Sequence, residues 1–342
     1  MTEQQILALL EDLQVPPSMI GGVSVRPDAT TVVLEVPPDQ AKAFAPVQQQ
    51  IESVLKKQVT GKVQVVLTAA RSAPTAKPQP KPVAPGIKAI IAVASGKGGV
   101  GKSTVATNLA AAALASGLKV GLLDADIYGP SQPTMLGIHS GPPPLDDEKR
   151  MIPPVAHGIK VMSMGFMVDP ERALVWRGPM VHSAINQMLR DVAWGDLDIL
   201  FVDMPPGTGD AQLSLAQNAH LAGAVIVSTP QDLALADARR AIAMFGQVKV
   251  PVLGIIENMS LYHCPNCGHE AHIFGHGGAK TEAEKLGVPF LGELPLDMAV
   301  REAGDAGMPL VLAAPERGAV FMAIVRTILQ MDQLETQSAQ VR

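Results

Sequence analysis

The chain has 342 residues, a length typical of two domains or of one large and one small domain. Its formal net charge of −5 gives no electrostatic footprint for DNA or RNA, so we expect no nucleic-acid partner. Two cysteines exclude a disulfide scaffold, and no apolar stretch approaches the roughly 20 residues of a membrane helix. With 47% apolar residues and no secretory signal, the sequence predicts a globular cytoplasmic protein without a membrane partner.

Residues 1–70 are predicted to form a small α+β domain. Residues 30–36 and 61–68 are rich in β-branched residues, as strands are, and residues 38–57 carry apolar residues at helical spacing. This segment contains no cysteine and no histidine, and we find no catalytic chemistry in it.

Residues 71–86 mark the boundary between two domains. Prolines stand at positions 74, 78, 80, 82 and 85. Proline at this spacing excludes a helix and an interior strand. The segment is therefore predicted to be an extended, semi-rigid linker.

Residues 87–342 alternate between strand-like and helix-like segments. Strands are predicted at 88–94, 119–123, 198–203, 224–228 and 250–256, with helices between them, for example at 103–116 and 232–246. Several of these strands are almost continuously apolar, which is typical of strands covered on both faces. The pattern predicts an α/β fold with a mainly parallel sheet and helices on both faces.

A glycine-rich loop follows the first of these strands and matches the phosphate-binding pattern G-x-x-x-x-G-K-[ST]. Its glycines let backbone N–H groups approach phosphate oxygens, and the next helix points its positive end at them. Lys102 would reach the β- and γ-phosphates, and the Ser103 hydroxyl would bind Mg²⁺. The residues expected to bind the nucleotide here are Gly96, Lys97, Gly98, Gly99, Val100, Gly101, Lys102, Ser103 and Thr104.

Lys97 gives the loop the form K-G-G-V-G-K-S. This form resembles the deviant Walker A loop, in which two subunits face each other and this lysine reaches the partner's nucleotide. The resemblance implies an ATP-dependent homodimer. A cation supplied by the partner would stabilise charge on the transferring phosphoryl group. A solvated loop lysine is the alternative.

Acidic residues end two of the predicted strands, and ligands of open α/β sheets bind at the carboxyl ends of strands. Asp203 is interpreted as the Walker B carboxylate, directed towards Mg²⁺ through water. By resemblance to the same class, Asp126 would polarise the attacking water, Asp124 would support the metal shell, and the Gly207 amide would contact the γ-phosphate. For Asp124 a purely structural cap is the alternative.

The nucleotide is expected to be ATP rather than GTP, because the chain contains no N-K-x-D motif. Asn258 follows the predicted strand at 250–256 and matches the position at which this class contacts adenine. An ordinary strand-end turn asparagine is the alternative.

The only two cysteines, Cys264 and Cys267, stand in the run CPNC. A C-x-x-C turn places two thiolates where they can bind one soft metal centre. A twofold dimer would supply four sulfurs, which suit a [4Fe–4S] cluster or a single Zn²⁺. A redox dithiol, a zinc site completed by nearby histidines of the same chain, and an inert thiol pair remain alternatives.

Together the motifs resemble the Mrp/ApbC family of iron–sulfur cluster carrier ATPases over residues 87–315. The resemblance implies a homodimer that binds and hydrolyses ATP, with Lys97, Lys102, Asp126 and Asp203 as catalytic residues. It further implies a labile [4Fe–4S] cluster, bridged by Cys264 and Cys267 of each copy and exchanged with scaffolds and apo-proteins. Residues 1–70 resemble the MIP18-like domain of bacterial members. The runs that carry the resemblance are SGKGGVGKST (95–104), LLDADIYGPSQPTMLG (122–137), WRGPM (176–180), VDMPPGTGDAQLSLAQ (202–217), VSTPQDLALADARR (227–240), GIIENMS with CPNCG (254–268), IFGHGGA (273–279) and LGELPLD (291–297).

Three other classes share parts of this pattern. A Min- or Par-type positioning ATPase would use a membrane helix or a DNA-binding surface. The apolar segment 319–333 has Arg326 as its only basic residue, so we expect it to pack on the sheet instead. A nitrogenase-type reductase takes its two cysteines from separate segments. An ATPase dimer held by structural zinc would be distinguished by its metal content.

Overall fold

The computed structural model divides into two compact units, Met1–Pro80 and Lys81–Arg342. It describes residues 3–13, 15–16, 19–25, 29–36, 41–59, 61–69, 86–139, 141–167 and 178–340. The linker predicted at 71–86 lies outside these residues, apart from Gly86, and so does part of the WRGPM run.

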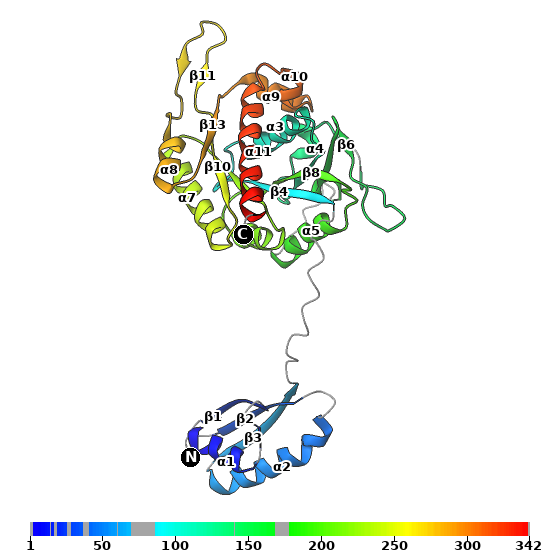
Figure 1. Ribbon diagram of the computed structural model, residues 1–342, viewed down its shortest axis with the longest axis vertical. Coiled ribbons are helices and arrows are strands. Elements are labelled where there is room, and N and C mark those ends of the chain that lie inside the picture. The colour runs from blue at the N-terminus through cyan, green and yellow to red at the C-terminus, as the bar shows by residue number, and fades with distance from the viewer. Residues whose placement is uncertain are drawn as a thin grey trace. The chain divides into compact units, whose positions relative to one another are not determined.

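The first unit is a three-stranded sheet with two helices (Figure 1). β1 pairs antiparallel with β2, and β2 pairs parallel with β3 across α2. Alternate residues of β2, Val32, Leu34 and Val36, are buried, as expected for a strand with one covered face. Val32 and Leu34 form a core with Ile6 and Leu55 of the helices. The elements are α1 (Glu3–Asp12), β1 (Ile20–Val25), β2 (Ala29–Val36), α2 (Ala41–Gln58) and β3 (Lys62–Ala69).

The second unit is built on an eight-stranded sheet in the order β13-β10-β9-β4-β8-β5-β7-β6. Every neighbouring pair is parallel except β6 and β7. The central strands are buried along almost their whole length, which requires cover on both faces. The predicted α/β fold with a mainly parallel sheet is confirmed. The strands are β4 (Ile87–Ala94), β5 (Val120–Asp124), β6 (Val155–Ala156), β7 (Ile159–Ser163), β8 (Leu197–Asp203), β9 (Gly223–Ser228), β10 (Val252–Asn258) and β13 (Phe290–Leu294).

Helices connect the strands and cover the sheet (Figure 1). The last helix, α11, buries Phe321, Ile324, Val325 and Ile328 against α3 and β13, so the expected packing of this apolar segment is confirmed. The helices are α3 (Lys102–Ala115), α4 (Gln132–Met135), a 3₁₀ turn (Met164–Phe166), α5 (Gly178–Arg190), α6 (Asp210–Asn218), α7 (Asp232–Gln247), α8 (Gly278–Leu286), α9 (Met298–Asp305), α10 (Leu310–Ala313) and α11 (Ala319–Gln340).

None of the helices in the described part of the chain has the length and apolar character needed to cross a membrane.

One edge of the sheet collects the loops that follow its parallel strands, because the carboxyl ends of parallel strands meet at the same edge. The glycine-rich loop follows β4, the acidic residues end β5 and β8, and Asn258 ends β10. Beyond β10 the chain forms a hairpin of β11 (Tyr262–His263) and β12 (Glu270–Ala271), which projects from the sheet (Figure 1). The fold therefore brings the predicted nucleotide and thiol motifs to one edge.

Candidate functional site

The glycine-rich loop is shaped by close contacts at two glycines. A Cβ at Gly96 would lie 2.2 Å from the backbone carbonyl of Asp237, so only glycine lets α7 approach the loop. Gly101 has a φ of +83°, and a Cβ there would lie 2.2 Å from Nδ2 of Asn258. The space beside Gly99, in contrast, is open. Backbone amides at the mouth of the loop are therefore accessible to a phosphate group.

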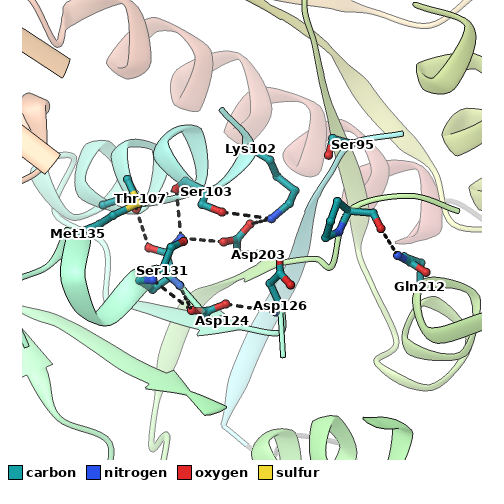
Figure 2. A network of polar contacts seen from close by, with 12 residues as sticks. Ser95, Lys102, Ser103, Thr107, Asp124, Asp126, Ser131, Met135, Asp203 and Gln212 are labelled. Atoms are coloured by element: carbon teal, nitrogen blue, oxygen red, sulfur yellow. Dashed lines mark hydrogen bonds and ion pairs between the residues drawn. The ribbon is translucent and has the colours of Figure 1, made fainter. Parts of the chain in front are cut away.

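Lys102 and Asp203 form a buried ion pair at the start of α3 (Figure 2). The Lys102 side chain is 6% exposed and Asp203 is fully buried. Nζ of Lys102 pairs with Oδ1 of Asp203 and lies 3.3 Å from Oγ of Ser103. The predicted phosphate-binding lysine, magnesium-binding hydroxyl and Walker B acid are thus brought together.

The Ser103 hydroxyl and the Asp203 carboxylate are hard oxygen donors, the kind that Mg²⁺ prefers. Both contact the same ammonium group, so both face one point at the end of the loop. The donor set therefore fits a magnesium ion bound together with nucleotide phosphates.

Asp124 lies next to this pair and is fully buried. Its Oδ2 accepts hydrogen bonds from the backbone N–H groups of Ser131 (3.0 Å) and Gln132 (3.1 Å) and from the Ser163 hydroxyl (3.1 Å). Burial, reinforced by the nearby Asp203, raises the pKa of Asp124 to about 7, although these hydrogen bonds oppose the shift. Asp124 thus fixes the loop after β5 through hydrogen bonds, and its protonation sets the charge next to Asp203.

Asp126 is half-buried and lies close to both Lys102 and Asp203 (Figure 2). Loss of water contact raises its pKa, the Lys102 ammonium opposes this, and Asp203 adds to it. A carboxyl group whose pKa is raised accepts a proton more readily near neutral pH, as a general base does. Asp126 therefore lies beside the Lys102–Asp203 pair, and its role in catalysis stays a prediction.

Two residues that were predicted to contact the nucleotide, Lys97 and Gly207, form no hydrogen bond or ion pair with the Lys102–Asp203 pair in the described structure. Lys97 is half-buried and lines a small cleft of about 120 Å³ with Thr229 and Phe274. Gly207 has a φ of +100°, and its N–H donates to the carbonyl of Ser95 at 3.0 Å. This amide would leave Ser95 before it could contact a γ-phosphate.

A cleft of about 510 Å³ opens beside the glycine-rich loop and is lined by Gly101, Thr104 and Asn258. The Asn258 amide donates to the carbonyl of Val100 at 2.8 Å, so it supports the loop and lines the cleft. The LPLD segment 294–297, which begins at the end of β13, also lines this cleft. The sequence analysis includes this segment in the run LGELPLD (291–297) but gives it no role in the site, because strand β13, whose carboxyl end would be the signal, was not predicted.

The two cysteines lie in a tight turn between β11 and β12. The Cys264 N–H donates to the His269 carbonyl at 2.9 Å, and the Gly268 N–H donates to the Cys264 carbonyl at 2.8 Å. Gly268 has a φ of +71°. The Cys264 thiol accepts hydrogen bonds from the backbone N–H groups of Cys267 and Asn266, which lower its pKa. The turn thus favours the thiolate, the form that binds metals.

The histidines around this turn form other contacts. His272 interacts with the Ser260 carbonyl at 3.1 Å, and His276 interacts with Glu293 at 2.9 Å. In the described part of the chain, no three histidine, cysteine, aspartate or glutamate side chains are grouped to hold a metal ion.

A second cleft, of about 430 Å³, lies beside Cys264 and shares a wall with the first. The shared wall consists of Pro295, Leu296, Asp297 and Arg317. The Leu296 N–H donates to the Leu261 carbonyl at 2.8 Å, three residues before Cys264. One short segment thus borders both the nucleotide edge and the thiol hairpin.

Comparison with known proteins identifies the family of the chain. Residues 86–329 match the family model described as ParA, NUBPL iron-transfer P-loop NTPase. An Arabidopsis thaliana protein, named as a mitochondrial iron–sulfur protein required for NADH dehydrogenase, is 58% identical over 67% of the chain and 74% of its own length. The iron–sulfur cluster carrier protein of Escherichia coli K12 is 55% identical over 71% of the chain and 65% of its own length.

A solved structure has a similar fold. The nucleotide-binding protein of Archaeoglobus fulgidus, determined in complex with ADP and with cobalt, is 45% identical and has a TM-score of 0.58. The likeness covers 65% of this chain and 87% of that one. The chain therefore belongs to the NUBPL iron-transfer family of ParA-type P-loop NTPases.

Proposed function

We propose that the chain is an ATP-hydrolysing iron–sulfur cluster carrier. Two copies hold a labile [4Fe–4S] cluster as cargo, take it from scaffold proteins and pass it to apo-proteins. The observation that carries this proposal is the shared wall between a nucleotide cleft and an exposed turn with a thiol of lowered pKa. The names of the relatives, which include iron–sulfur cluster carrier proteins, support the same cargo.

ATP is bound along the glycine-rich loop, with its adenosine in the 510 Å³ cleft beside Asn258. Lys102 exchanges Asp203 for the β- and γ-phosphates. Ser103 and Asp203 would hold Mg²⁺, which would supply positive charge next to these phosphates. Asp126 orients and deprotonates the attacking water, and Asp124 fixes the loop that carries Asp126 through the Asp126 N–H at 3.2 Å.

The cargo is bound by Cys264 and Cys267 of each copy, which together supply the four thiolates of a [4Fe–4S] cluster. Cys267 is exposed and Cys264 is half-buried. Backbone N–H groups directed at the Cys264 sulfur favour the thiolate without blocking its exchange to an acceptor. An exposed cluster suits a carrier, because a transfer partner has to reach it.

The copies meet at the carboxyl edge of the sheet. Large apolar side chains are exposed there at four separate places: Tyr128 (70%) and Ile273 (56%) on loops, Leu233 (77%) in the first turn of α7 and Met298 (53%) in the first turn of α9. Exposed apolar side chains gathered on one edge are a feature of interfaces. Lys97 lies at the same edge and forms no ion pair with any residue that the structure describes, so its ammonium is available to the partner's nucleotide.

Residues 1–70 form a separate domain, residues 71–86 connect it, and residues 87–342 form the ATPase domain. We place the carrier in the cytoplasm, where thiols remain reduced and can bind a cluster.

Anaerobic reconstitution with iron and sulfide, followed by iron and zinc counts, tests the proposal. Wild type should bind about two iron atoms per chain, one [4Fe–4S] cluster per dimer, and the Cys264→Ala/Cys267→Ala variant should bind none. About half a zinc per chain that survives the procedure would instead support a structural zinc dimer and contradict the proposal.

A further inference from the structure

Gln132, the first residue of α4, is fully buried between the two acids of the nucleotide site. Its backbone N–H donates to Oδ2 of Asp124 at 3.1 Å. Its side-chain Nε2 donates to Oδ2 of Asp203 at 2.8 Å and to the Ser103 carbonyl at 3.1 Å. One uncharged residue therefore bridges Asp124, Asp203 and the first turn of α3.

The orientation of this amide is fixed by its neighbours. Oε1 of Gln132 lies 2.6 Å from the Thr107 hydroxyl, which can donate to it. The two acceptors on the other side, an acid oxygen and a carbonyl, both require the –NH₂ group. The reverse orientation would place Oε1 against both of these acceptors, so the amide has one favourable orientation; the single Thr107 proton is shared between Oε1 of Gln132 and the Ser103 carbonyl at 2.9 Å.

The two oxygens of Asp203 have different partners. Oδ1 pairs with Lys102, and Oδ2 accepts from Gln132. When Lys102 moves to a phosphate group, Gln132 is the remaining side chain, among the described residues, that donates to this carboxylate. An acid with no donor could rotate about its side-chain bonds, and its direction towards the metal site would be lost.

We propose that Gln132 is a positioning residue for ATP hydrolysis, holding the Asp203 carboxylate against the first turn of α3 while Lys102 binds phosphate. The inference rests on the proposed ATPase function and adds a residue that positions the magnesium-binding carboxylate. Gln132 lines neither of the two larger clefts and acts through Asp203. The competing explanation is that its side chain only fills space in the core.

Gln132→Met separates the two explanations, because methionine has a similar size and shape but no N–H donor. We expect kcat to fall roughly 10- to 100-fold, the effect of losing a hydrogen bond to a charged group, while KM for ATP stays within about twofold. Calorimetry adds a readout that needs no turnover. ADP affinity without Mg²⁺ should match wild type, and the gain in affinity on adding Mg²⁺ should shrink.

Gln247→Met is the matched control, because Gln247 is exposed at the last turn of α7, which begins at the nucleotide edge and runs away from it. It should match wild type in every assay. Thr107→Val is the second variant, and it is measured in the same assays if Gln132→Met does not fold. It removes the hydroxyl that orients the amide, so the same loss of kcat and of the Mg²⁺ effect should follow at smaller amplitude.

The proposal would be overturned if Gln132→Met had the kcat of the wild type and the same gain in ADP affinity on adding Mg²⁺. If Gln132→Met does not fold, the same result in Thr107→Val would overturn it. An equal loss of ADP affinity with and without Mg²⁺ would overturn it too, since it would show general damage to the cleft. A wild-type chain that hydrolyses no ATP would overturn the proposed function as well. That outcome is distinct, because it appears before any substitution is made.

Discussion

At the scale of single residues, the two lysines of the glycine-rich loop have different environments. Lys102 is buried and paired with Asp203, whereas Lys97 is half-buried and lies in a separate small cleft. A buried ion pair that loses one partner leaves an uncompensated charge, while a lysine without such a pair can be removed at little cost. The two residues should therefore differ in their effect on stability, although we propose that ATP hydrolysis requires both.

Lys102→Ala should lower the free energy of unfolding by about 3–5 kcal/mol and abolish ATP hydrolysis. Lys97→Ala should abolish hydrolysis but change the free energy of unfolding by less than about 0.5 kcal/mol. Urea denaturation and phosphate release measure the two effects. Equal stability losses in the two variants would contradict this assignment of the lysines.

Asp124 gives the chain a distinct pH dependence. Its pKa is about 7 in the folded state, whereas an aspartate in the unfolded chain has a pKa of about 3.9. Between these pH values the folded state keeps a proton that the unfolded chain releases. Raising the pH from about 4 to 7 therefore destabilises the folded state, by about 4 kcal/mol at most.

Asp124→Asn removes this titration. The difference between the variant's and the wild type's free energy of unfolding should thus shift in the variant's favour as the pH rises from 4 to 7. Urea denaturation of both proteins at pH 5 and pH 8 measures the shift. A difference that does not change with pH would show that Asp124 titrates in its ordinary range.

At the scale of elements, the segment after β13 connects the two clefts. Arg317 of the shared wall pairs with Asp297 at 3.2 Å, and its side chain is 59% exposed. An exposed pair contributes little to stability. Arg317→Ala should therefore change the free energy of unfolding by less than about 1 kcal/mol, yet weaken the effect of ATP on the rate of cluster release.

Cluster release with and without ATP, followed by the absorbance of the cluster, measures this effect. Arg150→Ala is the control, because Arg150 forms a similar partly exposed pair with Asp146 and lines neither cleft. An ATP effect of wild-type size in Arg317→Ala would show that the shared wall does not couple the sites.

The elements that sequence predicts best are those whose pattern is local. The central strands are continuous apolar runs. The first residue of each of β4, β5, β8, β9 and β10 is within two residues of the predicted first residue. Strand β13 was not predicted, because an edge strand is covered less completely and its run FLGEL mixes buried with half-buried residues. Burial on both faces produces the clear signal, and edge strands lack it.

In the candidate site, too, the residues that belong to a local sequence pattern could be predicted and the others could not. The loop at 96–104 and the acids at strand ends are short motifs, and the structure gathers their central residues. Gln132 could not be predicted, since its partners Ser103 and Asp203 are 29 and 71 residues away in the sequence. A buried glutamine is recognised only when the fold shows what it contacts.

At the scale of the whole molecule, the proposal requires two copies that meet at the carboxyl edge of the sheet. Leu233→Asp places a charge on the most exposed of the apolar side chains at that edge. It should weaken the ATP-bound dimer by at least about tenfold, measured by analytical ultracentrifugation. Val155→Asp, on edge strand β6, is the control, because Val155 is similarly exposed at 62% but lies at the far side of the sheet. Equal dimerisation in both variants would place the interface elsewhere.

The most direct measurement of the central claim is cluster transfer in the presence of an iron chelator. Reconstituted wild type is mixed with an apo-enzyme that needs a [4Fe–4S] cluster, and the enzyme's activity is followed with a chelator that traps free iron. We expect activity to appear despite the chelator, and the Cys264→Ala/Cys267→Ala variant to activate nothing. Activation that the chelator abolishes, or that the double variant supports equally, would contradict the claim that this chain carries the cluster.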